Sequence, residues 1–337
     1  MEPLISVLTP TFNHGKYIQT CIQSLLYQTH PYWEMIIIDD GSTDETPDIV
    51  AGYKDPRIRY LRMEHQGIDH LGEIYNHALQ ISRGELIMIL EGDDYIPPNR
   101  IELQLPSFKE PEVVLSHGKY AYVFDRRMML YPTPFKIDIL NNRPIGSALK
   151  AFLQGFNPIG SQSVMIRKSA LLEIGGFTQP KYLPLVDYPT WMKLALKGTF
   201  DYIPELLGYW RRHPQSITIN RNEEIFNAFL KYCDDFIEIY GEDLARLGLS
   251  EFIRNRGAIA YLSLAWIYLA SGDWTKAVDY GKRSWASRKG VSSSFKIKMI
   301  IGLIGAYLHT NLPKYFKKLN QWLYQKGPVI DKMVLEG

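Results

Sequence analysis

The chain has 337 residues, of which 46% are hydrophobic and 22% charged, and its formal net charge is +2. This composition is typical of a soluble globular protein, and the length favours one large domain with an appendage, or two domains. A net charge so close to zero argues against nucleic acid as a partner. The two cysteines, Cys21 and Cys233, lie far apart in helix-like sequence. We therefore expect neither a disulfide framework nor a cysteine-ligated metal.

Nothing in the sequence indicates export or a membrane-spanning helix. Residues 1–10 lack the basic start, apolar stretch and cleavage site of a signal peptide, and no apolar run reaches the roughly 18 residues that a spanning helix needs. The nearest is residues 299–308, whose basic and aromatic flanks suit an interfacial helix, although we favour a core helix of a helical domain. We expect a cytoplasmic protein, with any membrane contact peripheral, on the inner face and through the C-terminal helices.

Strand-like and helix-like segments alternate through the first part of the chain. The predicted order is strand 5–12, helix 16–28, strand 33–40, helix 44–54, strand 57–63, helix 71–82 and a last strand that ends at residue 90. The strands are nearly continuous apolar runs, as expected for strands that are buried on both faces. The pattern predicts βαβ units and a mostly parallel sheet.

The pattern is mixed from about residue 100 to 220 and helical beyond it. The mixed part contains a strand at 113–125, a loop at 131–146, a strand followed by a helix and a glycine turn at 161–177, a helix at 184–198 and a strand-like stretch at 200–218. Residues 260–285 resemble one helical hairpin with a Gly-Asp turn, and no second copy follows at the spacing of a repeat protein. We predict two domains, 1–220 and an all-helical appendage, 221–337.

Polar residues gather at the carboxyl ends of three predicted strands. They are Thr9–Thr11, Asp39–Asp40 and Glu91–Asp94. In parallel α/β sheets, ligands bind beyond the carboxyl ends of the strands. The three groups therefore predict a binding site at this edge of the sheet.

The densest of these groups is LEGDDY, in which Glu91, Asp93 and Asp94 follow an apolar strand. Crowded carboxylates repel one another and lose hydration unless a cation meets them. Oxygen ligands suit Mg²⁺ or Mn²⁺, which usually add substrate phosphates as further ligands. Taken alone, the segment is equally typical of a solvated acidic turn or a helix start. The second acidic strand end, Asp39–Asp40, favours the metal site.

Several motifs in order resemble one known family. Two stretches are similar to the nucleotide-binding half of family 2 glycosyltransferases, which share the GT-A fold: SVLTPTFNHGKYIQTCIQSLLYQTHPYWEMIIIDDGSTDET and GELIMILEGDDY. The resemblance continues through GSQSVMIRKSALLEIGGF, LVDYPTWMKLALKG and YWRRHPQSIT, and covers roughly residues 4 to 218. It implies an α/β GT-A domain that transfers a sugar, with inversion, from a nucleoside diphosphate sugar to a hydroxyl of a glycan or lipid-linked acceptor.

The resemblance also implies a nucleotide site. Thr9, Pro10 and Thr11 would line the nucleotide, and Asp40, with Asp39, would bind the base, commonly uracil. The donor would then be a UDP-sugar.

The implied metal site follows from EGDD, which matches the family's acidic motif. Asp93 would contact the ribose and, with Asp94, the Mn²⁺ or Mg²⁺ ion on the diphosphate, and His213 would contact the metal or the diphosphate. The first acid of the motif is usually Asp, and Glu91 stands there in this chain. Gln66 belongs to a loop that lies over the nucleotide in relatives.

The acceptor side is implied by two later motifs. Gly176 and Phe177 match the turn that shapes the acceptor side, and Asp187 matches the general base. The carboxylate that precedes this base in the family is replaced by Val186. Without the family pattern, the sequence around Asp187 favours an ordinary helix start over a general base. Arg211 and Arg212 could reach the diphosphate or lie on the surface.

Two other functions compete with the glycosyltransferase. A nucleotidyltransferase also uses paired acids and Mg²⁺, but it requires a glycine-rich phosphate loop with a basic residue, and only Gly15-Lys16 follows the first strand. A glycosyltransferase-like scaffold without activity is the second alternative, supported by Val186 and Glu91. Metal-dependent binding of a uridine diphosphate, in preference to a nucleoside triphosphate, would favour a glycosyltransferase over a nucleotidyltransferase. Loss of turnover in Asp187→Asn, with donor affinity retained, would favour an enzyme over a scaffold.

Overall fold

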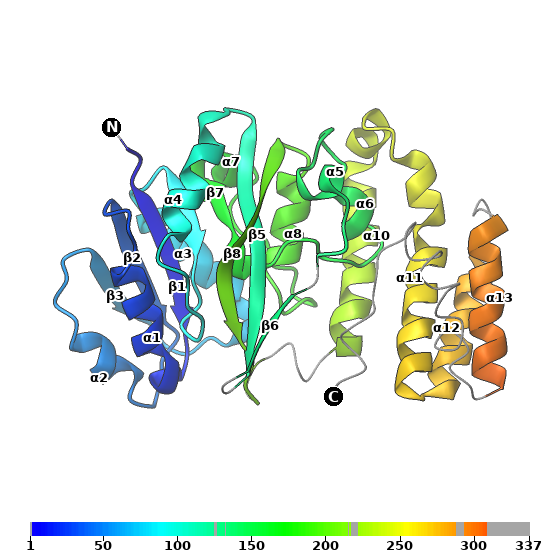
Figure 1. Cartoon of the computed structure of the whole chain (residues 1–337), viewed down its shortest axis with the longest axis horizontal. Coiled ribbons are helices and arrows are strands. Elements are labelled where there is room, and N and C mark those ends of the chain that lie inside the picture. The colour runs from blue at the N-terminus through cyan, green and yellow to red at the C-terminus, as the bar shows by residue number, and fades with distance from the viewer. Residues whose placement is uncertain are drawn as a thin grey trace. The chain divides into compact units, whose positions relative to one another are not determined.

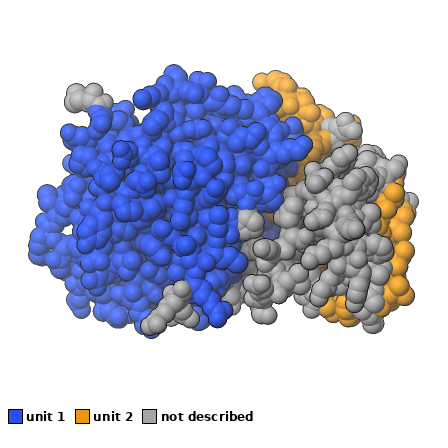
Figure 2. Space-filling view, viewed as in Figure 1, with its two compact units in different colours: residues 1–152, 157–235 blue, residues 153–156, 236–337 orange. Residues whose placement is uncertain are grey.

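A computed structural model describes residues 2–124, 127–131, 133–214, 216, 222–287 and 293–308 of the chain (Figure 1). The chain divides into two compact units (Figure 2). One contains residues 1–152 and 157–235, and the other contains residues 153–156 and 236–337. The predicted boundary at residue 220 lies outside the described residues, so the division into domains 1–220 and 221–337 stays a prediction.

The first part of the chain alternates between strands and helices in the predicted order. The elements are β1 (Ile5–Thr11), α1 (Gly15–Leu26), β2 (Trp33–Asp39), α2 (Thr46–Ala51), β3 (Ile58–Arg62), α3 (Leu71–Ile81) and β4 (Leu86–Ile89). These four strands are parallel, in the order β3-β2-β1-β4. Every residue of β1, β2 and β4 is buried, which explains why their sequences are apolar without alternation.

The following part extends the same sheet. Its elements are α4 (Arg100–Gln104), β5 (Val113–Phe124), β6 (Arg127–Leu130), α5 (Ile137–Leu140), α6 (Leu149–Phe152), β7 (Met165–Arg167), α7 (Lys168–Glu173), α8 (Asp187–Leu194) and β8 (Thr199–Arg211). The sheet continues β4-β7-β5-β6, and β8 pairs with β5 in parallel, whereas the other pairs of this part are antiparallel. The predicted mostly parallel α/β sheet with flanking helices is confirmed. The predicted loop at 131–146 was wrong in part, because it contains α5, which buries Leu140.

A buried arginine secures the sheet beside the acidic loop that follows β4. Arg100 is fully buried, and its guanidinium donates to the carbonyl oxygens of Gln162 at 2.9 Å and Val164 at 2.7 Å. A longer hydrogen bond of 3.4 Å reaches the carbonyl of Ile89, the last residue of β4. These bonds satisfy a cation that would otherwise be costly to bury, and they fix the end of β4.

The C-terminal elements are helices. They are α10 (Asn222–Arg246), α11 (Ser250–Ser271), α12 (Trp274–Ala286) and α13 (Ser293–Tyr307). The predicted Gly-Asp turn joins α11 to α12: Gly272 adopts a left-handed conformation, and the Asp273 side chain caps α12 by accepting from the Lys276 main chain at 3.1 Å. Within the described residues, no helix has the length and apolar character needed to cross a membrane.

Candidate active site

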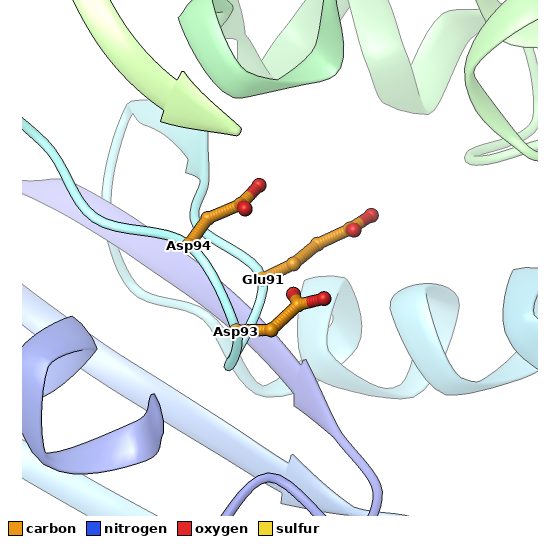
Figure 3. A group of neighbouring side chains, drawn as sticks. All are labelled: Glu91, Asp93 and Asp94. Carbon is orange, nitrogen blue, oxygen red and sulfur yellow. The ribbon is translucent and has the colours of Figure 1, made fainter. Parts of the chain in front are cut away.

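Three carboxylates project from the loop that follows β4. They belong to Glu91, Asp93 and Asp94, and one ligand oxygen from each lies within 4.8 Å of the others (Figure 3). All three side chains extend to the same side of the loop, and the Asp94 carboxylate lies nearest the end of a green strand, β8 (Figure 3). Asp94 is only 2% exposed. The structure thus brings together the three acids of the predicted metal motif.

The charges of these acids are only partly compensated by the protein. Burial, and then the neighbouring Asp93, raises the pKa of Glu91 to about 7. Burial, followed by the charges of Asp93 and Glu91, raises the pKa of Asp94 well above its usual range. Burial also opposes ionisation of Asp93, but the hydrogen bond with His213 and the charge of His14 outweigh it and lower the pKa of Asp93. Such a cluster suits a divalent cation, which would favour all three charged forms.

Two histidines face Asp93. Nε2 of His213 lies 3.1 Å from Asp93 Oδ2, and Nε2 of His14 lies 4.0 Å from the same oxygen. Nδ1 of His213 is buried and has no hydrogen-bond partner among the described residues. The His213 ring stacks on Tyr17 at 4.8 Å. His213 therefore lies beside the acidic loop, and its contact with a metal or a diphosphate stays a prediction. His14 is a neighbour of the acids that sequence reasoning missed.

Arg211, at the end of β8, forms hydrogen bonds with the acidic loop. Its main-chain N–H donates to Asp94 Oδ1 at 2.8 Å, and its guanidinium donates to the carbonyl of Asp93 at 2.7 Å. The guanidinium also lies 4.8 Å from the ring centre of Tyr17. Arg211, and Arg100 through its charge interaction with Asp94, place positive charge beside the three carboxylates.

The two aspartates at the end of β2 hold the nearby loops in place. Asp39 accepts from the Ser42 main chain at 2.8 Å and from the hydroxyl of Tyr60. The Asp40 carboxylate accepts from the main-chain N–H groups of Gln66, at 2.8 Å, and of the following glycine, at 2.9 Å. Asp40 therefore brings the predicted nucleotide loop to the end of β2, and base recognition by either aspartate stays a prediction.

The predicted nucleotide residues of β1 lie between β2 and β4. Thr9 is fully buried, and its Oγ1 has no hydrogen-bond partner among the described residues. Pro10 pairs with Ile38 of β2, and Oγ1 of Thr11 lies 3.1 Å from Nδ1 of His14. The end of β1 therefore lies beside the acidic loop, and contact of these residues with a nucleotide stays a prediction.

The predicted acceptor turn is connected to the acidic loop through α3. The side-chain amide of Asn76 donates to the carbonyl of Phe177 at 2.9 Å and accepts from its main-chain N–H at 2.8 Å. Tyr75 packs its ring 4.8 Å from Phe177 and donates its hydroxyl to Glu91 at 3.0 Å. Gly176 has φ +84°, a conformation that L side chains rarely adopt. Sequence reasoning took α3 only as an amphipathic helix and missed both Tyr75 and Asn76.

Asp187 lies in the first turn of α8, after Val186 at the N-cap. Asn157 donates its amide to Asp187 Oδ2 at 2.8 Å, whereas Oδ1 is buried and without a hydrogen-bond partner among the described residues. Burial raises the pKa of Asp187 to about 6, against the main-chain N–H of Tyr188 and the amide of Asn157, which lower it. The charge of Asp187 also contributes to the raised pKa of Glu91. The arrangement is that of a carboxylate poised to accept a proton.

Comparison with known proteins agrees with this geometry. The model of the family described as glycosyl transferase family 2 matches residues 6–175. TuaG of Bacillus subtilis, a glycosyltransferase named for teichuronic acid biosynthesis, is 32% identical over 225 residues, which are 65% of this chain and 83% of TuaG. The chondroitin synthase of Escherichia coli is 28% identical over 256 residues, which are 74% of this chain and 34% of the synthase.

Solved structures share the fold at low sequence identity. Residues 1–349 of S. aureus TarS superpose with a TM-score of 0.61 and 21% identity, covering 94% of this chain and 92% of that one. A mannosyltransferase of Pyrobaculum calidifontis, solved with GDP-Man and Mn²⁺, gives a TM-score of 0.52 and 17% identity, with 97% and 89% covered. These likenesses show a GT-A fold. From the family match and the relatives together, the chain belongs to glycosyltransferase family 2 and is a glycosyltransferase.

Proposed function

We propose that this enzyme moves a sugar from a UDP-sugar to a hydroxyl of a glycan or of a lipid-linked intermediate, with inversion at the sugar carbon. The observation that carries the proposal is the Asp187 carboxylate, which has one oxygen fixed by Asn157 and the other buried without a partner. An inverting transfer requires such a base, separate from the group that holds the leaving diphosphate.

The acidic loop is the proposed diphosphate side. Asp93 and Asp94 would hold Mn²⁺ or Mg²⁺, with His213 completing the donor set and Glu91 close enough to contribute an oxygen. A divalent cation bound there would neutralise the leaving diphosphate as a Lewis acid. Among the fold relatives, the Pyrobaculum mannosyltransferase was solved with Mn²⁺, which supports this choice of cation.

The donor is proposed to be a nucleoside diphosphate sugar with uracil as its base. TarS was solved with UDP-GlcNAc, with a TM-score of 0.56, 17% identity and coverage of 94% of this chain and 92% of that one. The Pyrobaculum enzyme was instead solved with GDP-Man. The fold therefore accommodates more than one base, and the preference for uridine rests on the family pattern around Asp39 and Asp40. Thr9, Pro10, Thr11 and Gln66 would complete the nucleotide site.

The acceptor hydroxyl would approach between Asp187 and the turn at Gly176 and Phe177. Asp187 Oδ1 takes the hydroxyl proton as the oxygen attacks the sugar carbon. A pKa of about 6 leaves this carboxylate ionised near neutral pH and more basic than an ordinary aspartate. Asn157 keeps the carboxylate from turning away, because its amide holds the other oxygen.

We also propose that the enzyme works in the cytoplasm, without nucleic acid, and touches the inner membrane face only through its C-terminal helices. In α13, Ile297, Ile300 and Ile304 are exposed at helical spacing, while Met299 on the same helix is fully buried. An amphipathic helix of this kind can lie in the interface of an anionic membrane.

A thermal-shift panel tests the donor and the metal together. The enzyme is heated with UDP-, GDP- and ADP-sugars, each with and without Mn²⁺, because a ligand that binds the folded state raises the melting temperature. We expect the largest shift with UDP-sugars, and only when Mn²⁺ is present. An equal shift without metal would overturn the metal site, and a larger shift with GDP-sugars would overturn the uridine preference.

A further inference from the structure

The side chains of Arg211 and Arg212, the two consecutive arginines at the end of β8, contact different parts of the structure. Because neighbouring residues of extended backbone face opposite ways, Arg211 and Arg212 cannot both point at the acidic loop. Arg211 contacts Asp93 there. The guanidinium of Arg212 lies instead over the rings of Tyr122 and Trp210, at 5.0 and 5.7 Å. The sequence left two positions open for Arg212, at the diphosphate or on the surface, and the structure places its guanidinium over these rings and not on the acidic loop.

Arg212 has no anionic partner within the described part of the chain. The Nε atom of Arg212 is buried and has no hydrogen-bond partner among the described residues. No described carboxylate oxygen lies within 4.0 Å of a guanidinium nitrogen of Arg212. Arg57 offers a contrast: it lies 3.8 Å from the ring centre of Trp33 and also pairs with Asp55 at 2.7 Å. A guanidinium that is partly removed from water and has no anion is unfavourable, and an anion supplied by a ligand would relieve this cost.

An aromatic surface adjoins Arg212. We call it the aromatic wall, and it consists of Tyr120, Tyr122, Tyr131 and Trp210. Tyr120 stacks on Tyr131 at 4.7 Å, and Tyr122 lies 5.0 Å from Trp210. Tyr120, Tyr131 and Trp210 are half-buried and keep part of their surface exposed, whereas Tyr122 is buried. Aromatic rings with polar edges are suited to cover the apolar face of a sugar ring while bonding its hydroxyls.

The aromatic wall begins next to the proposed base. The segment that starts at Asn157, which holds Asp187, continues to Gly160, and a Cβ at Gly160 would lie 2.4 Å from the ring of Tyr120. Gly160 therefore packs directly on the wall. The negative charge of Asp187 is also among the causes that raise the pKa of Tyr120, after burial and the neighbouring tyrosines. The wall thus extends from the neighbourhood of Asp187 to Arg212.

We propose that the aromatic wall and Arg212 form an acceptor subsite for a saccharide that carries an anionic group, a phosphate or a carboxylate. The sugar ring lies on the wall, and the anion accepts hydrogen bonds from the guanidinium of Arg212, whose fork matches both groups. This inference rests on the proposed function, because it takes Asp187 as the base. It adds the charge class of the acceptor, which the family match leaves open.

Binding of three matched probes tests the subsite. Wild-type enzyme, saturated with UDP and Mn²⁺, is titrated with para-nitrophenyl β-glucoside, with the corresponding glucuronide and with the phosphate ester of the glucoside. We expect one or both anionic probes to bind on the order of tenfold more tightly than the glucoside, the scale of a charge-assisted hydrogen bond. Whichever anionic probe binds better identifies the group as carboxylate or phosphate. No preference for either anion would overturn the proposal.

Two variants separate recognition from folding. Arg212→Gln should lose the preference for anions while binding the neutral glucoside as before, and Arg57→Gln, the matched control, should keep the preference. A purely structural arginine would weaken all three probes alike, and an unchanged preference in Arg212→Gln would also contradict the subsite. If Arg212→Gln does not fold, Arg212→Lys must retain part of the preference. Titration of the wild-type enzyme with UDP and Mn²⁺ alone tests the proposed function separately. Failure to bind UDP in that titration would contradict the donor site and not the role of Arg212.

Discussion

Asn157 donates its side-chain amide to Oδ2 of Asp187 at 2.8 Å and leaves Oδ1 of the same carboxylate buried without a partner among the described residues. The main-chain N–H of Tyr188 also lowers the pKa of this carboxylate, as expected for an acid in the first turn of a helix. An unsatisfied buried oxygen costs free energy in the resting protein. The proposed base role assigns this oxygen a partner, the hydroxyl of the acceptor.

The raised pKa of Asp187 predicts a pH-dependent gain in stability for Asp187→Asn. The folded-state pKa is about 6, above the ordinary 3.8, so the folded protein holds this proton more tightly than the unfolded chain. Wild-type stability is therefore lost as the pH rises from about 4 through about 6, and the asparagine variant escapes this loss. We expect the variant's advantage in free energy of unfolding to grow by on the order of 2 kcal/mol between about pH 4 and pH 7, measured by denaturant titration without metal. An advantage that stays constant with pH would contradict the raised pKa.

The acidic loop predicts metal-dependent donor binding. Asp93→Ala and Asp94→Ala each remove an oxygen ligand, so both should weaken the binding of UDP in the presence of Mn²⁺, by roughly tenfold or more. Asp48→Ala, which removes an exposed carboxylate on α2, should bind as wild type does. Calorimetry is the measurement. Unchanged, metal-dependent binding in both loop variants would overturn the assignment of these residues to the metal.

Substitution of two adjacent glycines in the acceptor turn measures the cost of backbone strain separately from the cost of a steric clash. Gly175 and Gly176 have φ +86° and +84°, but a Cβ at Gly175 meets nothing within 4 Å, whereas at Gly176 it would lie 2.3 Å from Asn76 Oδ1. Gly175→Ala should cost about 1 kcal/mol of stability from strain alone. Gly176→Ala should cost roughly 3 kcal/mol, because it also displaces the amide that holds Phe177. If both variants lose the same stability in thermal unfolding, the Asn76 side chain moves aside without a cost in free energy.

Thr9 offers a test of a buried hydroxyl. Its Oγ1 has no partner among the described residues, so Thr9→Val should leave stability unchanged or raise it by up to about 1 kcal/mol. Thr190 is the matched control, because its buried hydroxyl donates to Val186 at 2.6 Å and accepts from Thr178 at 3.0 Å. Thr190→Val should therefore lose about 1 to 2 kcal/mol. If Thr9→Val is stable and binds UDP as wild type does, Thr9 makes no polar contact with the nucleotide.

The sheet was predictable because its strands are buried. Residues 5–12 and 33–40 are apolar without alternation, as strands covered on both faces must be, and both become strands of the predicted parallel sheet. The short helix α5 was not predictable, since Ile137–Leu140 is a single turn between prolines and asparagines and forms by burying Leu140. Local pattern carries little information about an element of four residues.

The candidate site was predictable where its residues follow strand ends or match a family motif. Asp93 and Asp94 satisfy both conditions, Glu91 follows the same strand end but departs from the motif, and the structure places the oxygens of all three together. Asn157 satisfies neither condition. His14 follows the end of β1 within a stretch that resembles the family, but its local sequence gives no sign of its contact with Asp93. His14 lies near Asp93 because β1 and β4 are neighbouring strands, and Asn157 lies near Asp187 although 30 residues separate the two in sequence. No short-range pattern encodes such pairs.

The most direct test of the account is to measure turnover and donor binding in Asp187→Asn with UDP-GlcNAc, the donor solved with TarS, or with whichever UDP-sugar shifts the melting temperature most. Asparagine keeps the hydrogen bond with Asn157 within reach but cannot take a proton. We expect transfer and donor hydrolysis to fall by about 10²- to 10⁴-fold, while the dissociation constant of UDP with Mn²⁺ stays unchanged. Turnover that survives the substitution, or donor binding that is lost with it, would contradict the assignment of Asp187 as a base separate from the diphosphate site.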